Sequence, residues 1–75
     1  MVDRTLDVKG LNCPLPILLA KKTLAEVRVG GALEILATDP MSAADFTDFC
    51  RATGNRLLES SADAGVYRFV VERVA

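Results

Sequence analysis

The sequence predicts an α+β fold, a two-layer α/β sandwich with two helices packed on one face of a four-stranded mixed sheet. Apolar residues alternate along four short segments and recur at helical spacing along two others, in the order β-α-β-α-β-β. Each predicted helix carries a single apolar stripe, so each has one face to bury against a sheet. With 75 residues, 51% of them hydrophobic, we expect a single domain over residues 1–75 with a thin core.

The first half of the chain predicts a β-α-β unit. Residues 5–8 alternate as a half-buried strand does, and Lys9-Gly10 ends it. A helix is expected from Pro14 to about Val27, and a second strand over residues 32–38 follows a turn at Gly30-Gly31. The unit should be a right-handed crossover between parallel strands. Its predicted buried positions are Ile17, Ala20, Leu24 and Val27 on the helix and Leu33, Ile35 and Ala37 on the strand.

The second half predicts a helix followed by an antiparallel hairpin. The helix should run from about Pro40 or Met41 to Thr53, where Gly54 provides a C-terminal stop. Strands are expected over residues 56–61 and 66–73, joined by a hairpin loop over residues 62–65. The predicted apolar positions are Ala43, Phe46, Phe49 and Cys50 on the helix and Tyr67, Phe69 and Val71 on the last strand.

Composition argues against several classes of protein. The formal net charge is −1 without a run of like charges, so we expect no direct nucleic-acid partner. The four aromatic residues at 46, 49, 67 and 69 are better explained as core than as a platform for stacking bases. No apolar run approaches membrane-spanning length, and residues 1–4 lack the apolar stretch of a signal peptide. We therefore expect a cytoplasmic protein without a membrane partner, in a compartment where thiols stay reduced.

The segment Cys13-Pro14-Leu15-Pro16 is the strongest indication of chemistry. Pro14 favours an extended Cys13, the conformation of an N-cap residue, and would itself be the first helical residue. Pro16 still falls in the first turn, where a missing N–H breaks no helical bond. The helix dipole would then lower the pKa of the Cys13 thiol. A plain structural cap is the alternative, but Ser, Thr, Asp and Asn are better caps than Cys.

The remaining residues narrow what Cys13 can do. The chain has two cysteines and no histidine, so it lacks an ordinary zinc site and the base of a Cys–His hydrolase. There is no Cys-x-x-Cys pair for dithiol redox chemistry. Cys50 shares a helical stripe with Phe46 and is expected to be a buried structural residue with a raised pKa. A disulfide between Cys13 and Cys50 is not expected in a reducing compartment.

Partner docking is a further hypothesis for the first helix. If its apolar stripe faces the sheet, Leu15 and Leu19 form an exposed apolar pair beside the sulfur. Lys21 and Lys22 lie about two turns further on and either attract an acidic partner or form an ordinary solvated face. Three acidic residues gather at the start of the second helix, where the helix dipole favours them and suffices as an explanation: Asp39, Asp45 and Asp48.

Several stretches match one known family in the right order along nearly the whole chain. They are Leu6-Asp7-Val8-Lys9-Gly10-Leu11-Asn12 leading into Cys13-Pro14-Leu15-Pro16, then Lys21-Lys22, Thr38-Asp39-Pro40, residues 49–54 and Tyr67-Arg68-Phe69. With these stretches the chain resembles the TusA/SirA family of small sulfur-carrier proteins. The resemblance implies that Cys13 becomes a persulfide, supported by Gly10, Pro14 and Pro16. It implies a sulfur-donor protein, either a cysteine desulfurase or a rhodanese, and a sulfur-acceptor protein, with no metal and no organic cofactor.

Family members that serve tRNA thiolation often have an acidic residue between the two prolines, where this chain has Leu15. Sulfur oxidation and molybdenum or selenium metabolism therefore stay open beside tRNA thiolation. From the residues alone, a different class of function also stays open. The same thiol would serve a redox-sensing or regulatory interaction module that is not an enzyme.

Overall fold

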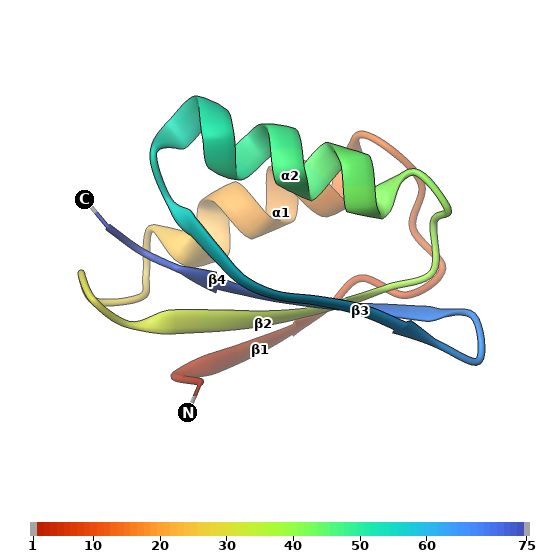
Figure 1. The fold of residues 1–75 in the computed structure, drawn as a ribbon, viewed down its shortest axis with the longest axis horizontal. Coiled ribbons are helices and arrows are strands. Elements are labelled where there is room, and N and C mark those ends of the chain that lie inside the picture. The colour runs from red at the N-terminus through yellow and green to blue at the C-terminus, as the bar shows by residue number, and fades with distance from the viewer. Residues whose placement is uncertain (1, 75) are drawn as a thin grey trace.

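The structure of the chain, a computed structural model, describes residues 2–74. Both helices lie side by side on one face of a single sheet, which confirms the predicted two-layer α+β sandwich (Figure 1). The elements follow the predicted order β-α-β-α-β-β. They are β1 (Arg4–Asp7), α1 (Leu15–Leu24), β2 (Ala32–Ala37), α2 (Ser42–Thr53), β3 (Arg56–Asp63) and β4 (Val66–Glu72).

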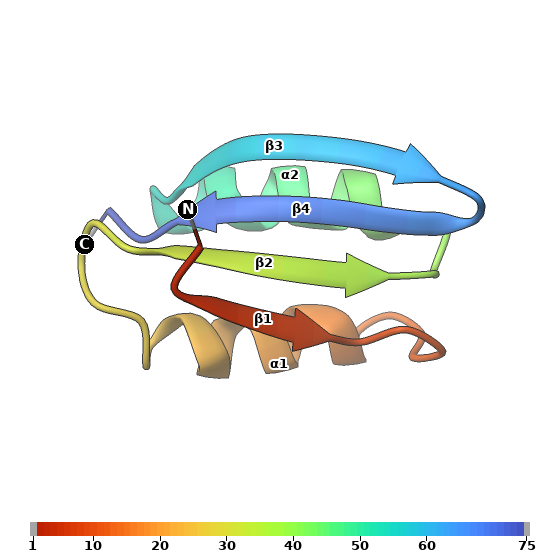
Figure 2. The same cartoon turned by 90° about the horizontal axis from the view of Figure 1, so that it is seen from below.

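The sheet is mixed, with the strand order β1-β2-β4-β3 (Figure 2). β1 pairs with β2 in parallel, with Leu6 opposite Ile35, and α1 is the crossover between them. β4 lies antiparallel between β2 and β3. Because β1 and β2 are parallel neighbours, the connections that follow them leave from the same edge of the sheet. Each of these two connections leads into a helix, and together they carry the residues of the candidate site.

The core lies between the sheet and the two helices, as the apolar stripes predict. On the sheet side, Leu33, Ile35, Ala37, Phe69 and Val71 are fully buried, which confirms these predicted inward positions. The helices contribute Ala20, Leu24, Phe46 and Cys50, and Val27 follows the end of α1. Tyr67, Ile17 and Phe49 pack at the edge of this cluster.

The predicted inward position of Ala43 is wrong. Ala43 is exposed, and Ser42 is buried in its place. α2 begins at Ser42, so the positions that recur every fourth residue on its inner face are Ser42, Phe46 and Cys50. The helical spacing, and not the apolar character of Ala43, decides which residues of α2 face the sheet.

Two predicted boundaries also differ from the structure. α1 ends at Leu24, not at Val27, and Arg73 donates hydrogen bonds from Nη1 to the carbonyl oxygens of Ala25 (3.0 Å) and Val27 (2.7 Å) beyond its end. β3 extends to Asp63, so the hairpin loop is two residues long. Its residues, Ala64 and Gly65, have φ of 51° and 81°. Positive φ at both positions is typical of the type I′ turn, whose twist matches that of the strands.

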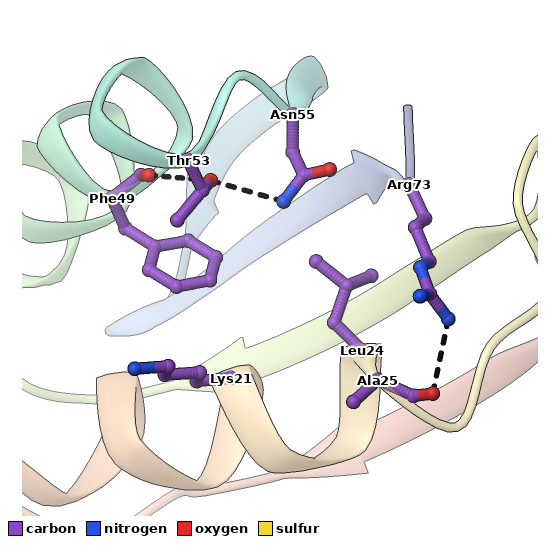
Figure 3. Close-up of a pocket in the computed structure, with 7 residues that line it drawn as sticks. All are labelled: Lys21, Leu24, Ala25, Phe49, Thr53, Asn55 and Arg73. Atoms are coloured by element: carbon purple, nitrogen blue, oxygen red, sulfur yellow. Dashed lines mark hydrogen bonds between the residues drawn. The ribbon is translucent and has the colours of Figure 1, made fainter. Parts of the chain in front are cut away.

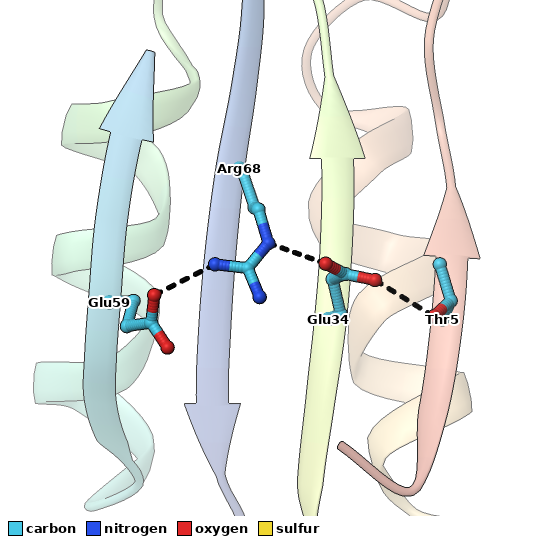
Figure 4. A network of polar contacts seen from close by, with 4 residues as sticks. All are labelled: Thr5, Glu34, Glu59 and Arg68. Carbon is cyan, nitrogen blue, oxygen red and sulfur yellow. Dashed lines mark hydrogen bonds and ion pairs between the residues drawn. The ribbon is translucent and has the colours of Figure 1, made fainter. Parts of the chain in front are cut away.

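The other face of the sheet carries a polar network with one side chain from each strand (Figure 4). Thr5 Oγ1 donates to Glu34 Oε1 (2.9 Å), and Arg68 donates from Nε to Glu34 and from Nη1 to Glu59 (2.8 Å). The hydrogen bonds from Arg68 and Thr5 lower the pKa of Glu34. These contacts join all four strands on the face that the helices leave uncovered.

Neither described helix has the length or the apolar character that a membrane span requires, since the longer one, α2, has 12 residues.

Candidate functional site

The loop between β1 and α1 carries Cys13 and is fastened to the neighbouring connection. Val8 is fully buried and donates its N–H to the carbonyl oxygen of Leu36 (2.8 Å), which anchors the start of the loop. Gly10 then turns the chain with a φ of +83°, a conformation that residues with a side chain rarely adopt. Its N–H donates to Oγ1 of Thr38, just after β2 (2.9 Å). The hydrogen bonds of Val8 and Gly10 therefore tie the start of the loop to the end of β2.

Asp39 forms the second fastening, directly beside the cysteine. Its buried carboxylate accepts the N–H of Cys13 at Oδ2 (2.8 Å) and the N–H of Met41 at Oδ1 (3.0 Å). The hydrogen bonds from Met41 and Cys13 lower the pKa of Asp39. One side chain therefore ties the Cys13 loop to the start of α2. The interpretation of Asp39 as a simple dipole partner of α2 missed this role.

The structure corrects the predicted helix start. Pro14, not Cys13, is the N-cap residue, and α1 begins at Leu15. Cys13 instead lies inside a turn closed by the N–H of Leu15, which donates to the carbonyl oxygen of Asn12 (2.9 Å). The Cys13–Pro14 peptide bond is cis. Pro16 falls in the first turn of α1 as predicted, and it is buried.

The predicted lowering of the thiol pKa is wrong in direction, although the Cys13 side chain is exposed. Partial desolvation of the sulfur raises the pKa of Cys13 most. The charge of Asp45, a hydrogen bond from the thiol to its carboxylate and the charge of Asp39 act in the same direction. The sulfur lies one residue before the helix cap and beside the acidic start of α2. Desolvation and the two carboxylates all favour the protonated thiol.

An apolar patch follows the cysteine along α1. Leu15 and Leu19 are exposed, and Leu18, which the sequence interpretation did not single out, is more exposed than either, at 55%. These residues stand three and four positions apart, so they share one face of the helix. Met41 adds a fourth exposed apolar side chain at the start of α2. Leu18 could have been found from its spacing, because a residue three positions after Leu15 lies on the same face of a helix.

The structure separates Lys21 from Cys13. At 1.5 Å per residue, Lys21 lies about 9 Å along α1 beyond Leu15. There it lines a shallow pocket between α1, the last turn of α2 and the end of β4, together with Leu24, Ala25, Phe49, Thr53, Asn55 and Arg73 (Figure 3). Lys22 is exposed one position further. The two lysines therefore flank the far end of α1 and do not contact the sulfur loop.

Cys50 differs from Cys13 in its accessibility to solvent. It is buried in the core at 4% exposure, and burial raises the pKa of its thiol, as predicted. Both cysteines are free. Among residues 2–74, no three side chains of His, Cys, Asp and Glu come together as metal ligands would. The accessible chemistry of the site is that of a single thiol with two carboxylates beside it.

Comparisons with known proteins identify one family. The sequence profile of the family described as sulfurtransferase TusA matches residues 4–73. The chain is 49% identical over 71 residues to the sulfur carrier protein TusA of Allochromatium vinosum, covering 95% of this chain and 93% of the relative. It is 40% identical to the sulfur carrier protein TusA of Pseudomonas entomophila, over 97% of this chain and 91% of the relative.

Among solved structures, the fold is similar to the crystal structure of a SirA-like protein from Desulfitobacterium hafniense. The TM-score is 0.83 at 28% sequence identity, covering 96% of this chain and 99% of that one.

Proposed function

Because this chain belongs to the TusA family of sulfurtransferases, we propose that it is a sulfur carrier that holds sulfane sulfur as a persulfide on Cys13. The observation that carries the proposal is the position of the thiol. Cys13 is exposed in a short turn that Asp39 fastens through its backbone N–H, while Cys50 is buried. A carrier needs an accessible thiol at a defined place, and of the two cysteines Cys13 provides it.

The transfer is a thiol–persulfide exchange without net oxidation or reduction. The Cys13 sulfur attacks the outer sulfur of a persulfide on the donor protein, and a new S–S bond forms as the S–S bond of the donor breaks. The donor sulfur leaves as a thiolate and ends as a thiol, with the proton that Cys13 gives up. Delivery to the acceptor protein repeats the exchange in the opposite direction.

Sulfur loading can be measured directly by intact mass. We expect a cysteine desulfurase with cysteine, or a rhodanese with thiosulfate, to add about 32 Da, one sulfur atom, to the reduced protein. Peptide mapping should place the addition on Cys13, and a reductant should remove it. Cys13→Ser should abolish loading, and Cys50→Ala should leave it unchanged. Loading that persists in Cys13→Ser, or that maps to Cys50, would overturn the proposal.

We further propose that Leu15, Leu18 and Leu19 form the surface on which donor and acceptor proteins dock beside the sulfur. Leu15 is 48% exposed and Leu18 55%, two residues and five residues after Cys13. Water-exposed leucines on one face of a helix gain free energy when a partner covers them. Lys21 and Lys22 extend this face toward the far end of α1, where they would attract acidic side chains of a partner.

The docking surface is tested by comparing a protein donor with a small reagent. Leu18→Glu should slow sulfur loading by the donor protein, while alkylation of Cys13 by iodoacetamide stays unchanged. Leu58→Glu is a matched control, since Leu58 has a similar exposure of 47% but lies in β3. Equal loading rates in the two variants would exclude the patch as a docking surface. The identities of donor and acceptor, and a cytoplasmic location, follow from the family resemblance alone and remain proposals.

The raised pKa of Cys13 bears on the redox-sensing alternative. Oxidation by peroxide follows the fraction of thiolate, and a raised pKa reduces that fraction at neutral pH. Peroxide should therefore oxidise Cys13 slowly. The same fact means that the thiol must give up its proton during sulfur transfer.

A further inference from the structure

The turn that carries Cys13 has little packing of its own to hold it in place. The four residues 12–15 are all exposed. The N–H of Leu15 closes the turn on the carbonyl oxygen of Asn12 (2.9 Å), but this hydrogen bond lies within the turn and does not attach it to the rest of the molecule. An exposed segment with few buried contacts moves easily. The location of the Cys13 sulfur therefore depends on contacts from elsewhere in the chain.

Two consecutive side chains that follow β2 supply those contacts. Among the described residues, two hydrogen bonds join residues 10–13 to a distant segment. The N–H of Gly10 donates to Oγ1 of Thr38 (2.9 Å), and the N–H of Cys13 donates to Oδ2 of Asp39 (2.8 Å). Because these bonds hold the two ends of a four-residue segment, the segment cannot swing about either of them.

The two acceptors are themselves fixed. Thr38 directly follows Ala37, the last residue of β2, which is fully buried. Asp39 is buried, and its other carboxylate oxygen accepts the N–H of Met41 (3.0 Å) just before α2. A functional group is held closely when the residues that support it are locked by their own packing and hydrogen bonds. Thr38 and Asp39 meet that condition, one through the sheet and the other through α2.

Sulfur transfer is sensitive to such support. The Cys13 sulfur must approach the S–S bond of the donor persulfide end-on, so the rate depends on how closely the sulfur is held to that line. We propose that Thr38 and Asp39 are positioning residues for sulfur transfer, an inference that rests on the proposed carrier function. They act through the backbone N–H groups of Gly10 and Cys13. The bonds that form and break are those of the exchange described above, and the proton of Cys13 still ends on the donor sulfur.

A protein donor and a small reagent should respond differently to the loss of this support. A docked donor protein presents its persulfide at one place, so a displaced Cys13 sulfur reacts with it slowly. Iodoacetamide diffuses to the exposed thiol from any open direction. Loss of a fastening should therefore slow loading by the protein donor and leave alkylation at the same pH unchanged. A variant that only loosens the fold would change alkylation as well.

Thr38 gives the sharpest test, because valine and serine separate the effect of its hydroxyl from that of its shape. Thr38→Val keeps the shape but lacks the acceptor for the N–H of Gly10, whereas Thr38→Ser keeps the acceptor. The maximal rate of loading by a cysteine desulfurase should fall about tenfold in Thr38→Val, with little change in the KM for the carrier. Thr38→Ser should load within about twofold of the wild type. Thr47→Val is the matched control, since Thr47 is exposed on α2 and its hydroxyl donates to the carbonyl oxygen of Ala43 (2.8 Å).

Asp39→Asn tests the second fastening, because it retains one acceptor for two N–H groups. Its maximal loading rate should also fall about tenfold or more. Alkylation of Cys13 by iodoacetamide should not be slower than in the wild type, because removing a negative charge does not disfavour the thiolate.

The outcomes separate the positioning role from the carrier function. Loading as fast as the wild type in Thr38→Val or in Asp39→Asn would overturn the role of that residue. Thr38→Ser as slow as Thr38→Val, equal slowing in Thr47→Val, or alkylation slowed by the same factor as loading would also overturn the inference. A wild-type protein that accepts no sulfur would instead overturn the carrier function itself.

Discussion

Phe46 is the side chain whose replacement tests most directly how the helix layer is held on the sheet. It is fully buried, and its ring centroid lies 4.9 Å from that of Phe69 in β4. A second ring, that of Phe49, lies 6.3 Å away at an interplanar angle of 79°, an edge-to-face contact. Phe46→Leu keeps an apolar side chain in the core but removes both ring pairs.

The expected loss follows from these two contacts. Each aromatic pair stabilises a fold by about 0.5–1.5 kcal/mol beyond the area that it buries, so two pairs contribute about 1–3 kcal/mol. A chain of this length has a free energy of unfolding of roughly 4–11 kcal/mol, so the variant should still fold. In a domain of this size each kcal/mol moves Tm by about 4–8 °C. Urea and thermal unfolding followed by circular dichroism measure both quantities.

Phe49→Leu is the matched control. Phe49 is only half-buried and takes part in one of the two ring contacts, so its loss should be about 0.5–1.5 kcal/mol. Below its melting temperature Phe46→Leu should load sulfur as the wild type does, because the site is fastened by Thr38 and Asp39. A Phe46→Leu variant as stable as the wild type, or less affected than Phe49→Leu, would refute the assignment of the ring contacts.

Three further predictions concern the fastening of the site, acid stability and a close backbone approach. Asp39→Asn keeps the side-chain shape but has one acceptor for two backbone N–H groups, so amide exchange at Cys13 should accelerate about tenfold. The pKa values of Asp39 and Glu34 are both lowered in the folded protein. The ionised carboxylates therefore stabilise the fold fully above the ordinary carboxyl pKa of about 4. This stabilisation is lost as the pH falls through the lower folded-state values. Urea unfolding from pH 6 down to 2 should show the free energy of unfolding decreasing toward acid, and a flat profile would contradict it. Gly31→Ala would bring a Cβ to 2.5 Å from Asp3 Oδ2 and 2.8 Å from Val27 Cγ1, and thermal unfolding should show a loss of about 1–3 kcal/mol.

The fold could be predicted from the sequence because its signals are local and repeated. The alternation through Leu33 and Ile35 and the helical spacing through Ala20 and Leu24 each define a buried face without knowledge of the partner. Element ends were less predictable, since Val27 is buried by a turn that follows α1 and continues its apolar stripe. The spacing of apolar residues indicates which positions are buried, but it does not indicate whether the backbone there is still helical.

The environment of the sulfur could not be predicted from the Cys-Pro-x-Pro segment because it is made by residues far away in the sequence. Asp39 lies 26 residues after Cys13, and Asp45 lies further still. The dipole of α1 alone predicts a lowered pKa for the Cys13 thiol. Partial desolvation of the sulfur, followed by the carboxylates of Asp45 and Asp39, raises the thiol pKa instead.

The predicted topology nevertheless contained the missing information. In adjacent parallel strands the residues that follow each strand meet at one edge of the sheet. Whatever follows β1 must therefore lie beside whatever follows β2, and here Gly10 meets Thr38 and Cys13 meets Asp39. A β-α-β unit therefore predicts that the segment before α2 lies beside the segment that carries Cys13. The position of Cys13 is thus set by both connections together, and a change at Asp39 should alter it as directly as a change beside the sulfur.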